Sequence, residues 1–309
     1  MNEMLPCFNT IYGNPSSLHS YGRDAAAIVD RARDRIAKAI NAERSNEIYF
    51  TSGGTEANNW AIKGIARANR AKGNHIITSQ IEHDSILESC KELENEGFEV
   101  TYLPVDKNGL VSITDLIHYI KPTTILVSIM AVNNEIGTIQ NIKTISNIVH
   151  ENGVIFHTDA VQAMGALKMD VTDMEIDVMS MSSHKIYGPK GVGALYIGNR
   201  VRNPKPLLSG GGQEGGMRSG TEATAQIAGF AKAVELRMEN WDEKMAKMAS
   251  LKEYCREKLL QIDTMVAVGR GESPHILFMS LPGYPSANIV TELGSQGICI
   301  SAGSACHKG

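Results

Sequence analysis

The sequence lacks the features that mark membrane-spanning and exported proteins. No apolar run in its 309 residues approaches the roughly 20 residues that a transmembrane helix needs. The first ten residues, MNEMLPCFNT, lack the basic and apolar regions of a secretory signal peptide. The sequence therefore predicts a cytoplasmic protein.

Charge of one sign is not in excess, and paired cysteines are absent. The 30 Lys and Arg residues nearly balance the 34 Asp and Glu residues, which gives a net charge of -4 and no basic footprint for nucleic acid or an anionic membrane. The cysteines show no CxxC spacing, which argues against a disulfide framework and a cysteine zinc site. They are five in number: Cys7, Cys90, Cys255, Cys299 and Cys306. We therefore expect small-molecule chemistry, with any functional cysteine acting as a nucleophile.

Strand-like and helix-like segments alternate from residue 47 onwards. Five apolar runs are typical of buried strands, with helical patterns between them: EIYFTS, HIITS, FEVTYLPV, TILVSIMAV and VIFHTDA. Repeated βα units with such strands predict an α/β fold with a mostly parallel sheet that is covered on both faces. Ligands of such sheets bind at the carboxyl ends of the strands.

The alternation ends in the last third of the chain. Two glycine-rich segments, YGPKGVGALYIG and SGGGQEGGMRSGT, interrupt it, and a helical segment follows from about 222 to 262. HILFMSL, SANIVTEL and ICIS then predict a short βαβ unit. We expect a large cofactor-binding domain over residues 1–240 and a smaller C-terminal α/β domain over residues 241–309, which is incomplete in this sequence.

A strand, a Gly-Gly turn and a helix follow one another in FTSGGTEANN. The first amides of a helix are free and its dipole is positive there, so Gly54 and Thr55 would face an anion such as a phosphate. The segment matches neither GxxxxGK[ST] nor GxGxxG, which argues against a nucleoside triphosphate or a dinucleotide. The alternative is that Thr55 is an ordinary helix cap, which contributes about 1 kcal/mol.

Lys185 occupies an unusual place in SMSSHKIYGPKG. It follows the apolar run IDVMSM, which is typical of a buried strand, whereas lysines are usually solvated. Asp159 ends another such strand in VIFHTDAVQ. A carboxylate at the base of a cleft is costly unless a cation or hydrogen bonds satisfy it. Asp159 therefore needs a positive partner.

Polar residues also follow two further strands. Asn133, Asn134 and Glu135 follow TILVSIMAV, and His83 follows HIITS. Taken singly, each of these residues is more simply a cap, a core residue or a surface residue. Metal ligation is another interpretation, for which four residues are available: His157, Asp159, His184 and Glu135. No pair among them has the i, i+4 spacing of a common zinc motif, and their convergence on one sheet edge favours a shared ligand.

Pyridoxal phosphate meets all of these requirements together. This cofactor needs a lysine for its aldehyde, an acid for its pyridine nitrogen and a cradle for its phosphate. Lys185 would supply the amine, and Asp159 would keep the pyridine nitrogen protonated so that the ring withdraws electrons. His83 would stack on the ring, and Asn134 and Gln162 would bind its polar edge. The sequence therefore predicts a pyridoxal-phosphate enzyme.

These motifs resemble those of the class V, fold-type I pyridoxal-phosphate enzymes, and in particular the cysteine desulfurases of the NifS/IscS group. The resemblance runs over nearly the whole chain through eight segments: GNPSSLHSYGR, FTSGGTEANN, IEHDSIL, ILVSIMAVNNEIGTIQ, FHTDAVQ, SSHKIYGPKGVGALY, GGGQEGGMRSGT and CISAGSAC. It implies L-cysteine as substrate, a homodimer, and a sulfur-acceptor protein such as an iron-sulfur scaffold. From the charge balance we expect no direct contact with nucleic acid and none with a membrane.

The resemblance also assigns roles to individual residues. Lys185 is expected to carry the cofactor, and His83 to stack on its ring and to move protons. The expected cofactor contacts are Gly54, Thr55, Ser182, Ser183 and His184 at the phosphate, Asn134, Asp159 and Gln162 at the ring, and Thr221 at the phosphate of the neighbouring subunit.

Cys306 lies in SAGSAC, a loop of small residues that offers nothing to bury a thiol. In the family that the sequence resembles, this cysteine attacks the sulfur of the cysteine substrate, which leaves a persulfide on the enzyme and alanine as product. A free thiol with a pKa of about 8.5 needs a base or a nearby positive charge to act as a thiolate. We expect Cys306 to be the nucleophile, and Cys299, between Ile298 and Ile300 on an apolar strand, to be structural.

The sequence departs from the family pattern at several places. Gly215 stands where an arginine is usual, and Ser183 stands where a glycine is usual before the His-Lys pair. An N-terminal segment that lines the substrate pocket and a C-terminal arginine that binds the substrate carboxylate have no counterpart in the 309 residues. We therefore expect a chain that keeps the cofactor fold and turns over its substrate poorly.

Three alternatives stay open on the sequence. A selenocysteine lyase or an aminotransferase of the same fold would keep Lys185 and Asp159 but would not need Cys306. A catalytically impaired, truncated homologue that acts as a dimeric scaffold is the non-enzymatic alternative. The sulfur acceptor is equally open among an iron-sulfur scaffold, a tRNA thiolation relay and a nitrogenase system.

Overall fold

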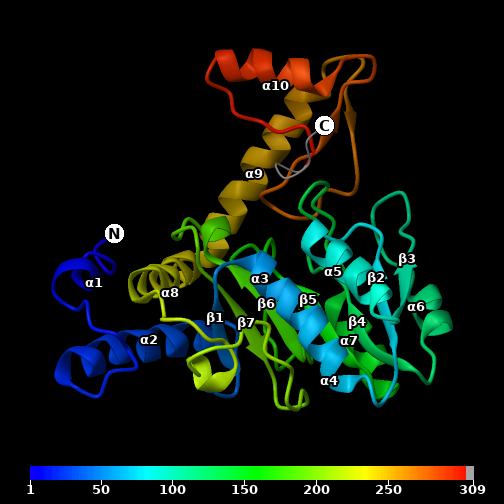
Figure 1. Cartoon of the computed structure of the whole chain (residues 1–309). Coiled ribbons are helices and arrows are strands. Elements are labelled where there is room, and N and C mark those ends of the chain that lie inside the picture. The colour runs from blue at the N-terminus through cyan, green and yellow to red at the C-terminus, as the bar shows by residue number, and fades with distance from the viewer. Residues whose placement is uncertain (304–309) are drawn as a thin grey trace.

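The computed structural model describes residues 1–303 and arranges them as a large α/β unit and a small C-terminal unit (Figure 1). Within these residues the large unit is built on a seven-stranded sheet, and the small unit contains a two-stranded sheet. The long helix α9 (Trp241–Leu259) leads from one unit to the other. The predicted α/β class is thus confirmed.

The large sheet has the strand order β1-β7-β6-β5-β4-β2-β3. Its strands are β1 (Ile48–Thr51), β2 (His75–Ser79), β3 (Glu99–Leu103), β4 (Thr124–Ser128), β5 (Ile155–Asp159), β6 (Val178–Ser182) and β7 (Gly193–Ile197). The pairs β6-β5, β5-β4, β4-β2 and β2-β3 are parallel, whereas β7 runs antiparallel to both β1 and β6. The sheet is therefore mostly parallel, as predicted.

Helices cover both faces of this sheet and create two apolar cores. Neighbouring strand residues point to opposite faces, and accordingly Ile77 and Val127 belong to one core while Ile76 and Leu126 belong to the other. The first core contains residues of α2 (Ser20–Ala39), α7 (Ile142–Glu151) and α8 (Thr224–Met238), and the second contains residues of α3 (Gly54–Asn59), α4 (Ile65–Asn69) and α5 (Asp84–Asn95).

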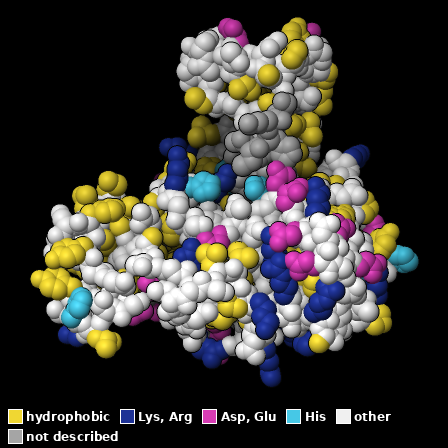
Figure 2. Space-filling model, in the orientation of Figure 1, with side chains coloured by type: hydrophobic (Ala, Val, Ile, Leu, Met, Phe, Trp, Pro, Cys, Tyr) yellow, Lys and Arg dark blue, Asp and Glu magenta, His cyan; other side chains and the backbone are white. Residues whose placement is uncertain are grey.

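The large unit contains several further short elements. They are α1 (Pro6–Asn9), α6 (Ile113–Tyr119), a π-helical turn η2 (Trp60–Gly64) between α3 and α4, and the short 3-10 turns η1 (Ser45–Glu47), η3 (Ser183–Ile186) and η4 (Glu214–Gly216). Among the described residues, no helix combines the length and the apolar character that crossing a bilayer requires. Lys, Arg, Asp and Glu side chains are mixed over the visible face, while apolar side chains gather near α1 (Figure 2).

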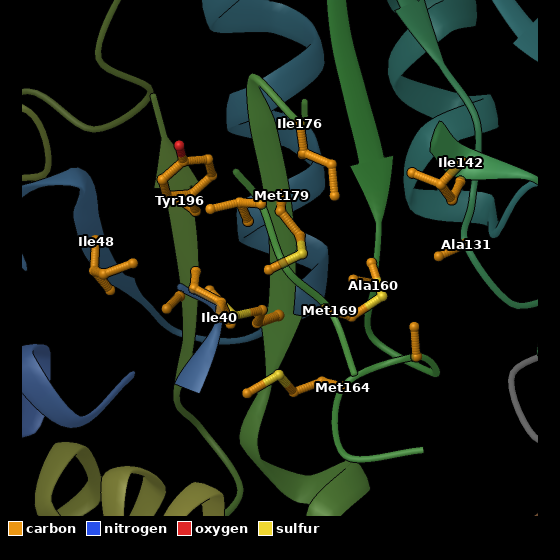
Figure 3. Packing of buried hydrophobic residues seen from close by; sticks show 14 of the residues in the cluster. Ile40, Ile48, Ala131, Ile142, Ala160, Met164, Met169, Ile176, Met179 and Tyr196 are labelled. Atoms are coloured by element: carbon orange, nitrogen blue, oxygen red, sulfur yellow. The ribbon is translucent and has the colours of Figure 1, made fainter. Parts of the chain in front are cut away.

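The glycine-rich segment YGPKGVGALYIG contains a strand that we did not predict from the sequence. Its second half is β7, and Met179 of β6 lies opposite Tyr196 of β7 in the first core (Figure 3). A Cβ atom at position 193 would lie 2.5 Å from the Met181 carbonyl oxygen and 2.8 Å from the backbone of Gly53. Glycine is needed there because the start of β7 passes close to the turn that precedes α3.

The helices differ from the expectations of the sequence analysis in three places. Residues 20–39 form α2, which we did not predict although Ala25, Val29, Ala32 and Ile36 are buried along one of its faces. The helical segment expected over 222–262 is broken at Asn240, whose φ of 48° ends α8 and begins α9. The helix predicted after the Gly-Gly turn of FTSGGTEANN is interrupted by the π turn η2.

The C-terminal unit is less regular than the predicted βαβ arrangement. It contains β8 (Val266–Ala267), β9 (Met279–Ser280), which is antiparallel to β8, and α10 (Ser286–Ser295). The predicted strand ICIS over residues 298–301 is wrong, because these residues form no strand in the described structure. Ile298 and Ile300 are 51% and 46% exposed and Cys299 is exposed too, so the expectation of a buried, structural Cys299 is also wrong.

Candidate active site

Most of the predicted site residues line one pocket of about 160 Å³. It lies where the carboxyl ends of β2, β4, β5 and β6 meet the start of α3, which is the edge that the parallel sheet predicts. The lining residues are Gly54, Thr55, Asn58, His83, Ser85, Met130, Val132, Asn134, Asp159, Val161, Gln162, Ser182, His184 and Lys185.

Three predicted site residues are not part of this lining. Ser183 is fully buried, and its hydroxyl has no hydrogen-bond partner among the described residues. Thr221 lines a separate groove beside Cys7 and Phe8, away from the pocket. Cys306 lies outside the described residues.

Asp159 forms the acidic base of the pocket. It is 5% exposed, and its carboxylate accepts hydrogen bonds from the Val161 backbone N–H at 2.9 Å and from Asn58 Nδ2 at 2.6 Å. Burial raises the pKa of Asp159, while these two donors and the nearby His83 and Lys185 act in the opposite direction. No cation forms an ion pair with this carboxylate within residues 1–303, so the carboxylate would gain from a positively charged ligand atom.

Asn58 is a buried pocket residue that the sequence analysis missed. Its side chain is 1% exposed, and Nδ2 also donates to Ser85 Oγ at 2.9 Å. Its Oδ1 has no partner in the described part of the chain. Because Asn58 follows Gly54 by four residues, both lie on the same face of α3, and this spacing was the available signal.

His83 is oriented by the start of α5, where it is the N-cap residue. Its Nδ1 accepts a hydrogen bond from the Ser85 backbone N–H at 3.1 Å and lies 2.8 Å from Ser85 Oγ. Since Nδ1 acts as an acceptor, the neutral ring carries its proton on Nε2. Nε2 is thus the nitrogen that is left for proton exchange.

The start of α3 forms the predicted phosphate end of the pocket. A Cβ atom at Gly54 would lie 2.7 Å from Val161 Cγ2, so only glycine lets the helix start this close to the strand ends. The N-cap residue is Gly53, and no side chain caps the helix. Thr55 is therefore not the ordinary cap of the alternative interpretation, and its exposed side chain stands at the first turn of the helix.

Lys185 lies in η3, directly after β6, and its side chain is exposed while it lines the pocket. Ser182, the last residue of β6, shares a hydrogen bond of 2.8 Å between its Oγ and His184 Nδ1. Tyr187 ends η3 with a φ of 65°. These short-range features place three predicted residues, Ser182, His184 and Lys185, along one side of the pocket.

The polar residues after β4 divide into structural and pocket-lining ones. Asn133 is 5% exposed, and its Oδ1 accepts hydrogen bonds of 3.0 Å from the backbone N–H groups of Glu135 and Ile136. Asn134 faces the pocket. Asn133 therefore shapes the turn that presents Asn134.

Glu82 is a buried carboxyl group beside the pocket. Its Oε1 accepts hydrogen bonds from Ser79 Oγ at 2.6 Å and from the Met130 N–H at 2.9 Å, while Oε2 has no partner in the described structure. Burial raises the pKa of Glu82 to about 8, and the nearby Asp159 adds to the rise. Glu82 is therefore mostly protonated at neutral pH.

The metal interpretation finds no support in the geometry of His157. Its two ring nitrogens lie 2.8 Å from Ser128 Oγ and 3.0 Å from Ser180 Oγ, so hydroxyl groups occupy both of them. Burial lowers the pKa of this histidine to about 3. Within residues 1–303, no three His, Cys, Asp or Glu side chains are grouped as metal ligands would be.

Pyridoxal phosphate fits the residues that are present. The buried Asp159 carboxylate forms no ion pair with any of the residues 1–303 and suits a protonated pyridine nitrogen. Gly54 and Thr55 line the pocket at the start of α3, where backbone N–H groups can bind a phosphate, and Lys185 offers an amine on the same pocket. These features lie on different elements, and a cofactor with an acid-binding ring, an aldehyde and a phosphate uses all of them.

Comparisons with known proteins agree with this fit. The chain matches the aminotransferase class-V family over residues 1–308. The cysteine desulfurase IscS of Clostridium botulinum (strain Hall) is 50% identical to it, over 99% of this chain and 78% of that protein. The cysteine desulfurase IscS of Methanosarcina thermophila is 48% identical, over 100% of this chain and 76% of that protein.

Solved structures give the same result. A NifS-like protein superposes with a TM-score of 0.94 at 37% identity, which covers 97% of this chain and 83% of that one. SspA in complex with cysteine superposes with a TM-score of 0.84 at 37% identity, which covers 98% of this chain and 85% of that one. The similarity therefore includes both the sheet and the C-terminal unit.

Proposed function

The chain belongs to the aminotransferase class-V family and, within it, to the cysteine desulfurases, and we propose that it removes sulfur from L-cysteine and carries it as a persulfide on Cys306. Alanine is the second product. The observation that carries this function is the joint placement of Lys185, Asp159 and His83 around one pocket, in a chain that is 50% identical to a cysteine desulfurase.

Pyridoxal phosphate is the cofactor of this family, and when bound it supplies an electron sink for the substrate. In our proposal Lys185 Nζ holds its aldehyde carbon. Gly54, Thr55, Ser182 and His184 line the phosphate end, with the buried Ser183 behind them. Asn134 and Gln162 bind the polar edge of the ring.

Asp159 and His83 have separate tasks in this proposal. The Asp159 carboxylate is held by Val161 and Asn58, and its negative charge favours a proton on the pyridine nitrogen. His83 stacks on the ring and exchanges a proton at Nε2, because its Nδ1 is already engaged by Ser85. The thiolate of Cys306 forms a bond to the substrate sulfur as the carbon–sulfur bond breaks; the electron pair of that bond stays with the substrate carbon, which takes up a proton to give alanine.

We further propose a homodimer in which Thr221 serves the pocket of the neighbouring subunit. Thr221 lies away from the pocket of its own chain, in a groove with Cys7 and Phe8. Large apolar side chains are exposed nearby in the N-terminal region, which is expected of a surface that a second copy covers: Leu5, Phe8, Tyr12, Leu18 and Tyr21. Figure 2 shows this apolar surface on the side of α1 and α2.

The remaining parts of the proposal concern domains, location and acceptor. A boundary between residues 240 and 241 is supported by the break at Asn240, where α8 ends and α9 begins. A cytoplasmic location stays a prediction. For the sulfur acceptor we propose an iron-sulfur scaffold protein, because the similar proteins carry the name IscS.

The test of the proposed function compares Cys306→Ala with Cys299→Ala in the full chain. Alanine and persulfide formation from L-cysteine should fall at least about 100-fold in Cys306→Ala, because no other thiol replaces the nucleophile. Cys299→Ala should keep the activity of the unmodified chain, since Cys299 is exposed and is not among the residues that line the pocket. Both variants should bind pyridoxal phosphate. Equal alanine release by both variants would favour a selenocysteine lyase, which does not need Cys306.

A further inference from the structure

A segment of the C-terminal unit packs on the turn that follows β4. The Ser273 N–H donates to the Gly137 carbonyl oxygen at 2.9 Å, and a Cβ atom at Gly137 would lie 3.0 Å from Ile276 Cβ. On its other side, Lys252 Nζ donates to the carbonyl oxygens of Gly271 and Ser273. The segment 271–276 is therefore fixed between α9 and the edge of the sheet that carries the pocket.

His275 reaches from this segment to a residue of the pocket. Its Nε2 lies 3.2 Å from Gln162 Oε1, and its Nδ1 lies 2.8 Å from Ser273 Oγ. Ser273 is fully buried. Both ring nitrogens thus have partners, one on the C-terminal unit and one on the pocket.

The direction of these hydrogen bonds follows from the chemistry of the groups. A carboxamide oxygen only accepts, so His275 Nε2 must donate to Gln162, and Nδ1 of the neutral ring then accepts from the Ser273 hydroxyl. Burial lowers the pKa of His275 to about 4, and the charges of Arg237, Lys252 and Lys185 act in the same direction. The ring is therefore neutral at physiological pH and carries its proton on Nε2.

This arrangement fixes which end of the Gln162 carboxamide is free. Its oxygen is occupied by His275, and its NH₂ group has no partner within residues 1–303. Without His275, a half-turn of the carboxamide would place the oxygen in the pocket at little cost. The phenolic oxygen of a pyridoxal ring is an acceptor, so it binds the NH₂ group and is repelled by the oxygen.

We propose that His275 is a positioning residue, which holds Gln162 with its NH₂ group available to the cofactor ring and so ties the pocket to the C-terminal unit. The inference rests on the proposed function, because it takes the pyridoxal ring as the partner of Gln162. His275 itself touches Gln162 and Ser273 and acts through Gln162 alone.

A double-mutant cycle tests this role through the dissociation constant of pyridoxal phosphate, measured by equilibrium dialysis. His275→Ala should weaken cofactor binding about three- to tenfold, which is the range for one neutral hydrogen bond. The variant with both His275→Ala and Gln162→Ala should bind no more weakly than Gln162→Ala alone, because the two residues act as one unit. If the fold-changes in the dissociation constant of the two single variants multiplied in the double variant, the proposal would be overturned.

Three further measurements separate positioning from a structural role. His275→Gln retains a donor at about the place of Nε2 and should restore most of the affinity, which also keeps the test valid if His275→Ala does not fold. The visible absorption of the bound cofactor changes with pH, and the midpoint of this change should shift in His275→Ala. In His275→Gln the midpoint should return to the value of the unmodified chain. His118→Ala, an exposed histidine on α6, is the matched control and should leave the affinity and the titration unchanged.

The outcomes distinguish this inference from the proposed function. If the unmodified chain takes up no pyridoxal phosphate, the proposed function itself fails. If the unmodified chain binds the cofactor and His275→Ala matches His118→Ala in affinity and absorption, the role of His275 is refuted while the function stands.

Discussion

Asn58 Nδ2 donates a hydrogen bond of 2.6 Å to Oδ2 of Asp159 at the base of the pocket. The same amide donates to Ser85 Oγ at 2.9 Å, and that hydroxyl lies 2.8 Å from His83 Nδ1. The acid and the imidazole are thus joined by one chain of hydrogen bonds. A change at Asn58 is therefore expected to affect both of them.

The first prediction concerns Asn58→Ala. Loss of the donor to Asp159 removes a hydrogen bond that favours the carboxylate, so the pKa of Asp159 should rise further and the ring nitrogen should lose part of its counter-charge. We expect cofactor binding about 10- to 100-fold weaker, the range for a hydrogen bond to a charged group. Fluorescence titration of the cofactor-free chain measures this. Asn59→Ala is the matched control, because the Asn59 amide donates to the Thr55 carbonyl oxygen, and equal affinities in the two variants would contradict the role of Asn58.

The second prediction concerns the buried carboxyl group of Glu82. Its pKa is about 8 in the folded chain against an ordinary value of 4.5, so the folded chain holds a proton that the unfolded chain releases between these pH values. The free energy of unfolding should therefore fall as the pH rises through this window. Glu82→Gln keeps the acceptor for Ser79 and Met130 and removes the ionisation. It should be more stable than the unmodified chain at pH 8, on the order of 1–3 kcal/mol.

Urea unfolding of the cofactor-free chain at pH 6 and at pH 8 measures the effect of Glu82→Gln. The exposed Glu88 on α5, the helix that begins two residues after Glu82, provides the control, since Glu88→Gln should leave the pH dependence as it is. If the free energy of unfolding of Glu82→Gln changed between pH 6 and pH 8 as much as that of the unmodified chain, Glu82 would not be the group that binds the proton.

The third prediction concerns the anchor of the second glycine-rich segment. Arg33 forms two hydrogen bonds of 2.6 and 2.8 Å to the Glu214 carboxylate, which also accepts from the Phe50 N–H at 2.9 Å. The side chain of Glu214 is 2% exposed. Glu214→Ala should lower the free energy of unfolding by about 3–5 kcal/mol, because it leaves the largely buried Arg33 guanidinium without its carboxylate partner.

An exposed ion pair provides the comparison for Glu214→Ala. Glu235 pairs with Lys232 at 2.7 Å on the surface of α8, and Glu235→Ala should change stability by less than about 1 kcal/mol. Both variants are compared by urea unfolding at one pH. Similar stabilities for the two variants would mean that the Glu214 pair contributes no more than a surface contact.

The fourth prediction concerns the thiols. Cys90 is fully buried, and burial raises its pKa to about 12, whereas Cys255 and Cys299 are exposed. Iodoacetamide at pH 7.5 should therefore label Cys255 and Cys299 in the folded chain and Cys90 only after unfolding. Peptide mass analysis over time gives the order. Labelling of Cys90 as fast as Cys255 would contradict its burial.

Much of the sheet is predictable from the sequence, since HIITS coincides with β2 and parallel strands need continuous apolar runs. The antiparallel β7 was missed because its glycine meets a need set by the distant Gly53 turn. The segment ICIS shows the opposite error. Its composition favours a strand, but a strand needs a partner, and none of the described residues pairs with it.

The site residues also fall into those that the sequence predicts and those that it does not. Asp159, His83 and Lys185 follow strands or lie in recognised motifs, so their convergence follows from the common direction of the strands. Asn58 was identifiable in principle from its spacing to Gly54. His275 was not, because its contact with Gln162 spans 113 residues and depends on how the C-terminal unit docks.

The central claim is that Lys185 holds pyridoxal phosphate over Asp159. Borohydride reduction of the cofactor-loaded chain, followed by peptide mass mapping, tests it most directly. The account predicts a pyridoxyl adduct on Lys185, and no adduct in Lys185→Ala. An adduct on another lysine, or a chain that takes up no cofactor at all, would contradict it.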